Sequence, residues 1–151
     1  MNLQEELKAL KERIAELEEL AKEEQEFPKM GDIYWRIDDR GSVDNCMYNN
    51  YYTDNHRQAI GNFFKTKEQA EFALEKLKVE VELRKFSRPF KEDEYNYFIQ
   101  IHPSRNNIVT ESDDYYPTQG TIYFESTTIA NEAIDTVGKE RIKKYIFGVE
   151  D

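Results

Sequence analysis

The sequence predicts an α+β fold in which a long N-terminal helix precedes two similar units of strands and helix. Three observations predict it: an uninterrupted helical segment at the start, alternating apolar positions typical of strands, and two Ser/Thr-headed stretches with helical spacing. We expect a coiled-coil helix at 1–27 and an α+β domain at 28–151, built from units at about 31–85 and 94–147. Each unit would be ββ(β)α, an antiparallel sheet with its helix on one face.

The N-terminal segment 2–26 contains neither glycine nor proline and is rich in strong helix formers. Its apolar side chains recur at steps of three and four, as in a coiled coil. The sequence therefore predicts a homodimer through five seam residues: Leu3, Leu7, Leu10, Ile14 and Leu17. The alternative is an amphipathic helix that lies on its own domain. Phe27-Pro28 ends the helix, because proline disfavours helical geometry at the residue before it.

The charges beside the seam indicate the direction of pairing. In a parallel pair, Glu6 of one helix would face Lys11 of the other. Arg13 would likewise face Glu18. Both pairs attract, so a parallel arrangement is favoured.

The first unit begins with a strand at 32–37, in which Ile33, Trp35 and Ile37 alternate with polar or amphipathic residues. A turn at 38–42 leads to a return strand at 42–48, followed by a polar loop at 49–57 and a third short strand at 58–65. Thr66 then begins a helix with capping-box spacing to Gln69. The apolar stripe of that helix is Ala70, Ala73, Leu74, Leu77 and Val81.

The second unit repeats this order with strands at 95–101, around 108–109, and at 120–124. A Ser/Thr cap at 126–128 begins a helix, which Gly138 separates from another at 139–147. The apolar stripe of the first of these helices is Ala130, Ala133, Ile134 and Val137. Trp35 and Ile37 precede Ile99 and Ile101 by 64 residues, which indicates an internal duplication whose two copies could merge into one sheet. Chance similarity of two ordinary segments is the alternative.

Composition excludes several classes of protein. Acidic side chains outnumber basic ones 31 to 21, giving a net charge of −10, so direct binding of nucleic acid is not expected. There is no long apolar run to span a membrane and no secretory signal. The single cysteine cannot form an internal disulfide, which fits a reducing cytoplasm.

No catalytic constellation is evident. The two histidines, His56 and His102, have no ligand-spaced neighbours, and no glycine-rich loop introduces a helix in the manner of nucleotide-binding proteins. Cys46 lies in an expected strand, where a small packed side chain is the usual role. The aspartate pairs 38–39 and 113–114 could bind a divalent cation, but both lie in turns or loops that favour aspartate for backbone reasons. We therefore expect a protein without cofactor, metal or enzymatic activity.

Two loops each carry a tyrosine doublet flanked by acidic residues. Tyrosine supplies a large, rigid contact area with a polar tip, and acidic neighbours favour a basic partner. An acidic chain could thus occupy the nucleic-acid channel of a protein by imitating phosphate charge. The alternative is that the tyrosines pack beneath the loops and the acids are merely solvated. The expected partner-binding residues are Asp38, Asp39, Tyr51, Tyr52, Asp54, Asp113, Asp114, Tyr115 and Tyr116.

The segment 61–71, GNFFKTKEQAE, follows the hairpin at 33–37 and Arg57. It resembles the GN-x-FKT-x-EEAE pattern of small accessory proteins from Firmicute phages and integrated elements, in which an N-terminal coiled coil is often attached. The resemblance covers about 29–78, and the second unit keeps only Gly120, an aromatic strand and a Ser/Thr cap. It implies a source and not a mechanism.

By analogy, phage accessory genes of this size often encode inhibitors of bacterial defence, including anti-CRISPR proteins. We therefore expect a protein of the bacterial host cytoplasm that binds and inhibits a defence complex, with a CRISPR effector nuclease as the leading target. The alternative is a non-catalytic structural or oligomerisation module of a phage or prophage complex.

Overall fold

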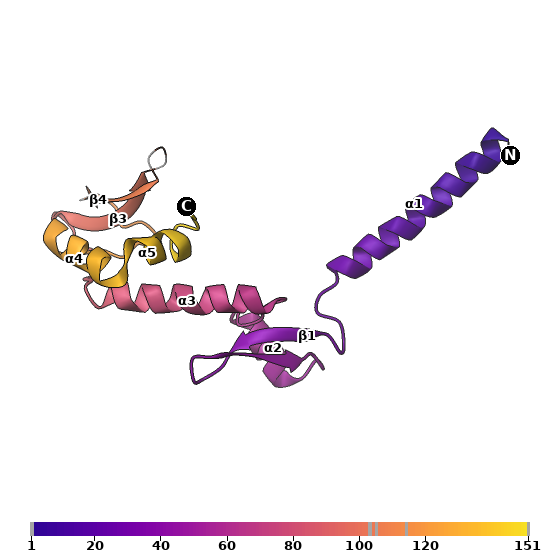
Figure 1. The fold of residues 1–151 in the computed structure, drawn as a ribbon, viewed down its shortest axis with the longest axis horizontal. Helices are drawn as coiled ribbons and strands as arrows, with labels where there is room; N and C mark the ends of the chain where they lie inside the picture. Colours follow the sequence, from indigo (N-terminus) through magenta and orange to yellow (C-terminus); the bar gives the residue numbers. More distant parts are fainter. Residues whose placement is uncertain (1, 103, 105, 114, 151) are drawn as a thin grey trace. The chain divides into compact units, whose positions relative to one another are not determined.

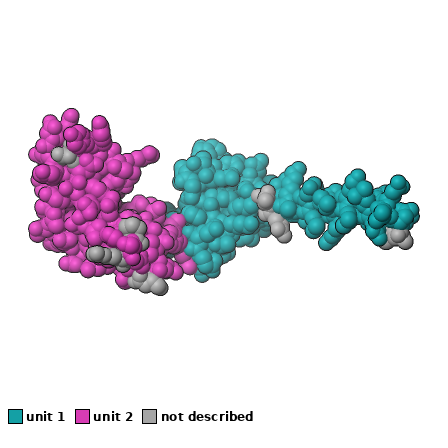
Figure 2. Space-filling view, turned by 90° about the horizontal axis from the view of Figure 1, so that it is seen from above, with its two compact units in different colours: residues 1–70 teal, residues 71–151 magenta. Residues whose placement is uncertain are grey.

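The computed structural model describes residues 2–150 apart from 103, 105 and 114, and Figure 1 shows its elements. The chain forms two compact units, Met1–Ala70 and Glu71–Asp151, which Figure 2 distinguishes by colour. The fold is α+β, as predicted: a long helix is followed by two separate two-stranded antiparallel sheets with helices. The expected merger into one larger sheet is not observed. No helix in the described part is long and apolar enough to cross a membrane.

Helix α1 spans Leu3–Gln25 and begins where the side chain of Asn2 can cap it. The Asn2 Oδ1 atom accepts from the Glu5 main-chain N–H at 2.9 Å, and a Glu5 carboxylate oxygen accepts from the Asn2 N–H at 3.1 Å. This reciprocal capping box satisfies two of the main-chain donors that a helix start leaves free. The helix therefore has a defined start, close to the predicted one.

In the first unit, strands β1 (Ile33–Ile37) and β2 (Val43–Met47) form a hairpin. The predicted polar loop at 49–57 is wrong, because helix α2 occupies Tyr52–Ala59. The predicted third strand at 58–65 reduces to a single bridge, in which Phe64 pairs with Trp35 of β1.

Helix α3 spans Lys67–Arg84 and begins as predicted. The Thr66 hydroxyl accepts from the Gln69 N–H, while the Gln69 side chain accepts from the Lys65 N–H, both at 3.2 Å. The boundary between the two compact units falls inside this helix. The expected first unit at 31–85 therefore differs from the observed one, because the C-terminal part of α3 joins the core of the second unit.

The second unit contains strands β3 (Asn96–His102) and β4 (Asn107–Asp113), paired antiparallel in full register. Helix α4 (Thr127–Val137) packs on this hairpin and contacts α5 (Lys139–Tyr145). All four predicted stripe residues of α4 are buried, which confirms that face. The core of the unit is Val79, Leu83, Phe124, Ala130, Ala133, Ile134, Val137 and Ile142.

The predicted stripe of α3 is only partly right. Leu77 and Val81 are about half exposed, whereas Val79 and Leu83 are buried. Each of these two pairs has helical spacing, and the pairs lie on different faces of α3. The core of the second unit buries the face with Val79 and Leu83, so the face with Leu77 and Val81 stays exposed.

The two units share the local features that suggested a duplication. Each hairpin is joined along its first strand by a later residue, Phe64 at Trp35 and Phe124 at Tyr97. Each then continues into a helix with a Thr or Ser cap. Among the described residues of the second unit, helix α2 has no counterpart, so the two copies differ most in the connection after the hairpin.

Candidate functional site

Both predicted tyrosine doublets lie at the surface. Tyr51, Tyr52, Tyr115 and Tyr116 are between 65% and 75% exposed. The rings of Tyr52 and His56 lie 3.9 Å apart on one face of α2, and those of Tyr115 and Tyr116 lie 5.8 Å apart. The alternative that the tyrosines pack beneath the loops does not hold for these four side chains. Their exposed aromatic area is the type of surface found at protein interfaces.

Asp54, expected at the docking surface, is buried instead, with 3% of its surface exposed. Its Oδ1 atom accepts from the Tyr34 hydroxyl at 2.6 Å, and its Oδ2 atom accepts from the main-chain N–H of Asn49 and Tyr51 at 3.0 and 3.1 Å. Arg57 donates to the Tyr34 oxygen at 2.8 Å and completes the cluster. The carboxylate therefore holds the start of α2 against the hairpin and is not offered to a partner.

The ionisation of this cluster follows from its hydrogen bonds. Burial, together with the hydrogen bond to Asp54, raises the pKa of Tyr34 to about 12. The same hydrogen bond from the Tyr34 hydroxyl lowers the pKa of the Asp54 carboxyl, and the N–H groups of Asn49 and Tyr51 act in the same direction. At neutral pH the cluster is therefore a neutral phenol that donates to a carboxylate.

Of the other predicted acids, Asp38 is also buried, and its Oδ1 atom accepts from the N–H groups of Arg40 and Ser42 at 2.9 Å. The bond from Ser42 lowers the pKa of Asp38 most, and that carboxylate closes the β1–β2 turn. Asp39 beside it is exposed. Asp113 is half-buried and accepts from the Tyr115 N–H at 2.8 Å, while Asp114 lies outside the described residues.

The acidic surplus is distributed unevenly along the sequence. Residues 1–26 carry nine acidic and four basic side chains, and residues 71–151 carry sixteen and eleven. Residues 27–70 carry six of each and are therefore neutral overall. The second tyrosine doublet lies in an acidic part of the sequence and the first lies in a neutral part. A basic partner would thus be attracted mainly to the second unit and to α1.

The two buried carboxylates predict that the first unit loses stability in acid. A lowered folded-state pKa stabilises the fold above the unfolded-state value of about 3.9, and this contribution is lost as the pH falls below that value and through the lower folded-state pKa. We expect the urea midpoint, followed by Trp35 fluorescence, to fall between pH 5 and pH 3. Trp35 is the only tryptophan and lies in β1, so it reports on the first unit. An Asp54→Asn variant should show a smaller pH dependence, and an equal one would contradict the assignment.

The apolar stripe of α1 is exposed along its length. Leu3, Leu7, Leu10, Ile14, Leu17 and Leu20 are between 48% and 83% exposed. Arg13 pairs with Glu16 of its own helix at 3.2 Å, beside this stripe. An apolar stripe with charged flanks on a 23-residue helix is the surface that a coiled-coil partner buries.

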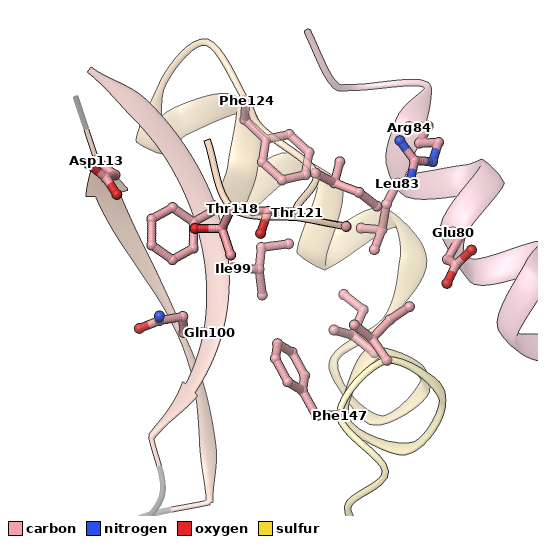
Figure 3. A pocket seen from close by; sticks show the side chains of 15 residues that line it. Glu80, Leu83, Arg84, Ile99, Gln100, Asp113, Thr118, Thr121, Phe124 and Phe147 are labelled. Atoms are coloured by element: carbon pink, nitrogen blue, oxygen red, sulfur yellow. The ribbon is translucent and has the colours of Figure 1, made fainter. Parts of the chain in front are cut away.

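A pocket of about 410 Å³ lies within the second unit (Figure 3). Helix α3, strand β3 and the segment 118–124 line it, together with Phe147 after α5. Asp113 also lines the pocket, and it lies two residues before Tyr115 in the sequence. Its position between apolar side chains with a few polar groups is typical of binding sites. No sequence pattern indicated this pocket, because its walls come from separate parts of the chain.

No group of three or more His, Cys, Asp or Glu side chains among the described residues is arranged to hold a metal ion. The Cys46 thiol is half-buried and lies 3.6 Å from the Arg57 guanidinium. Comparisons with family models, curated proteins and solved structures gave no match.

Proposed function

We propose that this chain is a non-catalytic docking protein that pairs with a second copy through α1 and binds a basic protein partner. The observation that carries the proposal is the exposure of both tyrosine doublets, on a chain with a net charge of −10. Aromatic side chains at the surface supply the binding energy of protein interfaces, and opposite charge speeds the encounter.

The second unit is the favoured docking surface. It combines Tyr115, Tyr116 and Asp113 with an acidic surplus in residues 71–151. In the first unit, by contrast, the carboxylates of Asp38 and Asp54 are buried and accept main-chain hydrogen bonds. Neither is therefore exposed to a partner together with the first tyrosine doublet. Pairing through α1 would present two such surfaces, and two linked sites increase the apparent affinity for a partner with repeated sites.

A basic surface able to attract this protein is typical of proteins that bind nucleic acid. The partner we propose is a host defence complex, and a CRISPR effector nuclease first among these. The resemblance of residues 29–78 to phage accessory proteins supports this choice by analogy. The protein would act in the bacterial cytoplasm by occupying a channel that otherwise holds phosphate groups.

A plasmid-interference assay tests the proposed function. We expect expression of the chain to restore transformation of a plasmid that the CRISPR system otherwise destroys. The Tyr115→Ala/Tyr116→Ala variant should reduce this effect by about tenfold or more, since buried aromatic anchors carry much of the energy of an interface. The Tyr51→Ala/Tyr52→Ala variant is the matched control, for which we expect a smaller loss. Full immunity in the presence of the wild-type chain would contradict the proposal.

A structural or oligomerisation module is the second candidate, supported by the exposed stripe of α1. It predicts self-association of the chain without any effect on immunity. The same plasmid-interference assay, read beside the solution mass, therefore separates the two candidates.

A further inference from the structure

The first strand of each hairpin has an outer edge, and in the first unit that edge is filled. Trp35 of β1 and Phe64 exchange two main-chain hydrogen bonds with N···O distances of 2.8 and 2.9 Å. At Ile37, two residues after Trp35 in β1, the side-chain amide of Asn62 continues this row of hydrogen bonds. It accepts from the Ile37 N–H at 2.6 Å and donates to the Ile37 C=O at 2.7 Å. Asn62 thus takes the place that an adjacent strand would occupy.

The corresponding edge of β3 in the second unit is open. Tyr97 and Phe124 exchange the equivalent two bonds, with N···O distances of 3.2 and 2.7 Å. Main-chain groups of alternate residues point to the same edge of a strand, so those of Ile99 and Ile101 face the edge that Phe124 occupies at Tyr97. Ile122 stands where Asn62 stands in the first unit, and it has no amide. Within the described residues, nothing forms a hydrogen bond to Ile99 or Ile101 at this edge.

The pocket of the second unit lies at this open edge. Ile99 and Ile122 both line it, which places the unpaired main chain beside an apolar hollow of about 410 Å³. Figure 3 shows the side chains of Leu83 from α3, Ile99 from β3 and Phe147 from the segment after α5 around the hollow. An unpaired strand edge supplies hydrogen bonds to an added strand, and an adjacent pocket selects its side chains.

The charges around the pocket indicate the chemistry of the occupant. The carboxylates of Glu80 and Asp113 line it, against the single guanidinium of Arg84. Glu80 forms no ion pair or hydrogen bond within the described part of the chain. An apolar side chain flanked by lysine or arginine therefore suits this site better than one flanked by acids.

We propose that the open edge of β3 accepts an extended segment of a partner protein, which adds a strand to the sheet and places one apolar side chain in the pocket beside basic neighbours. This inference rests on the proposed function, for which it supplies the mode of docking. Within the described residues nothing forms a main-chain hydrogen bond to the outer edge of β4 either, but Asp113 is the only residue of β4 that lines the pocket, whereas Phe98, Ile99 and Gln100 of β3 all line it. The pocket is therefore what selects β3 as the docking edge.

Amide hydrogen exchange with a model peptide tests this mode. The probe is acetyl-Lys-Val-Lys-Phe-Lys-Val-Lys-amide. In the free chain the Phe98 and Gln100 amides should be protected by β4, while the Ile99 amide exchanges faster. The peptide should slow exchange at Ile99 and Ile101 by about tenfold or more, the effect of adding a hydrogen-bonded strand. Unchanged exchange at Ile99, or equal slowing at Thr110 on the outer edge of β4, would overturn the proposal.

Control peptides test the two parts of the site without altering the chain. Methylation of alternate peptide N–H groups should abolish binding, because it removes the donors that face β3. Replacement of the central phenylalanine by serine should weaken binding by about tenfold or more, as expected when an apolar anchor is lost. Equal binding by the methylated peptide would show that no strand is added at β3, and equal binding by the serine peptide would show that the pocket holds no apolar side chain.

Two variants of the chain complete the test. Ile122→Asn should install the amide that closes the equivalent edge in the first unit, so the peptide should no longer protect Ile99. Glu80→Gln should weaken binding by about two- to fivefold, the range of an exposed ion pair, while the matched control Glu132→Gln on α4 should leave binding unchanged. Undiminished peptide binding by a folded Ile122→Asn variant would refute the inference. Since no immunity readout is used, failure here is distinguishable from failure of the proposed function.

Discussion

Replacing Leu10 and Ile14 with glutamate is expected to halve the solution mass of the protein. The wild-type chain should have twice the chain mass of 18.0 kDa by multi-angle light scattering. The variant should have the mass of one chain, because two negative charges at adjacent seam positions would be buried without partners in the pair. Both side chains are more than half exposed in the single chain, so the substitutions should leave its fold intact.

The matched control places the same two charges elsewhere on the helix. Ala9→Glu together with Ala15→Glu adds two carboxylates to α1 outside the predicted seam. This variant should keep the wild-type mass. A Leu10→Glu/Ile14→Glu variant of unchanged mass would show that the stripe is not a dimer seam, as would dissociation of the Ala9/Ala15 control.

Replacing Asp54 with alanine is expected to destabilise the first unit by about 2–4 kcal/mol. The change leaves the buried Tyr34 hydroxyl and the partly buried N–H groups of Asn49 and Tyr51 without their acceptor. It also leaves the Arg57 guanidinium without a carboxylate beside it, at 3.9 Å in the wild type. Urea unfolding followed by Trp35 fluorescence measures the change in the first unit.

Asp39→Ala is the control for the loss of one acidic charge in the same unit, since Asp39 is exposed. Its urea midpoint should match that of the wild type. If Asp54→Ala and Asp39→Ala unfold at the same urea concentration, the buried cluster does not hold α2 in place.

Local sequence signals predicted the elements that depend mainly on near neighbours. The capping box at Thr66 and the buried face of α4 were predictable, since a cap needs residues three apart and a stripe needs only helical spacing. The two hairpins followed from alternating apolar residues for the same reason.

Features that depend on distant partners were not predictable. Helix α2 is short and polar, and it is anchored by Asp54 to a tyrosine twenty residues earlier in the chain. The same long-range bond explains why Asp54 is buried, although the sequence predicted it at the surface beside the tyrosines. Likewise, α3 offers two apolar stripes, and the choice of Val79 over Val81 for the core depends on the elements packed against it.

Of the candidate site, the exposed tyrosines were predicted and the pocket was not. A doublet of tyrosines in a polar segment is visible in the sequence, and all four are exposed. The open edge of β3 depends on the absence of an amide at Ile122, which has meaning only beside the position of Asn62 in the folded first unit.

Light scattering of the purified chain mixed with a purified CRISPR effector nuclease tests the docking proposal most directly. We predict a complex whose mass is that of the effector plus the dimer, loss of target cleavage by the effector, and weaker association for the Tyr115→Ala/Tyr116→Ala variant. An effector that keeps its own mass and full cleavage in a molar excess of the chain would contradict the proposal.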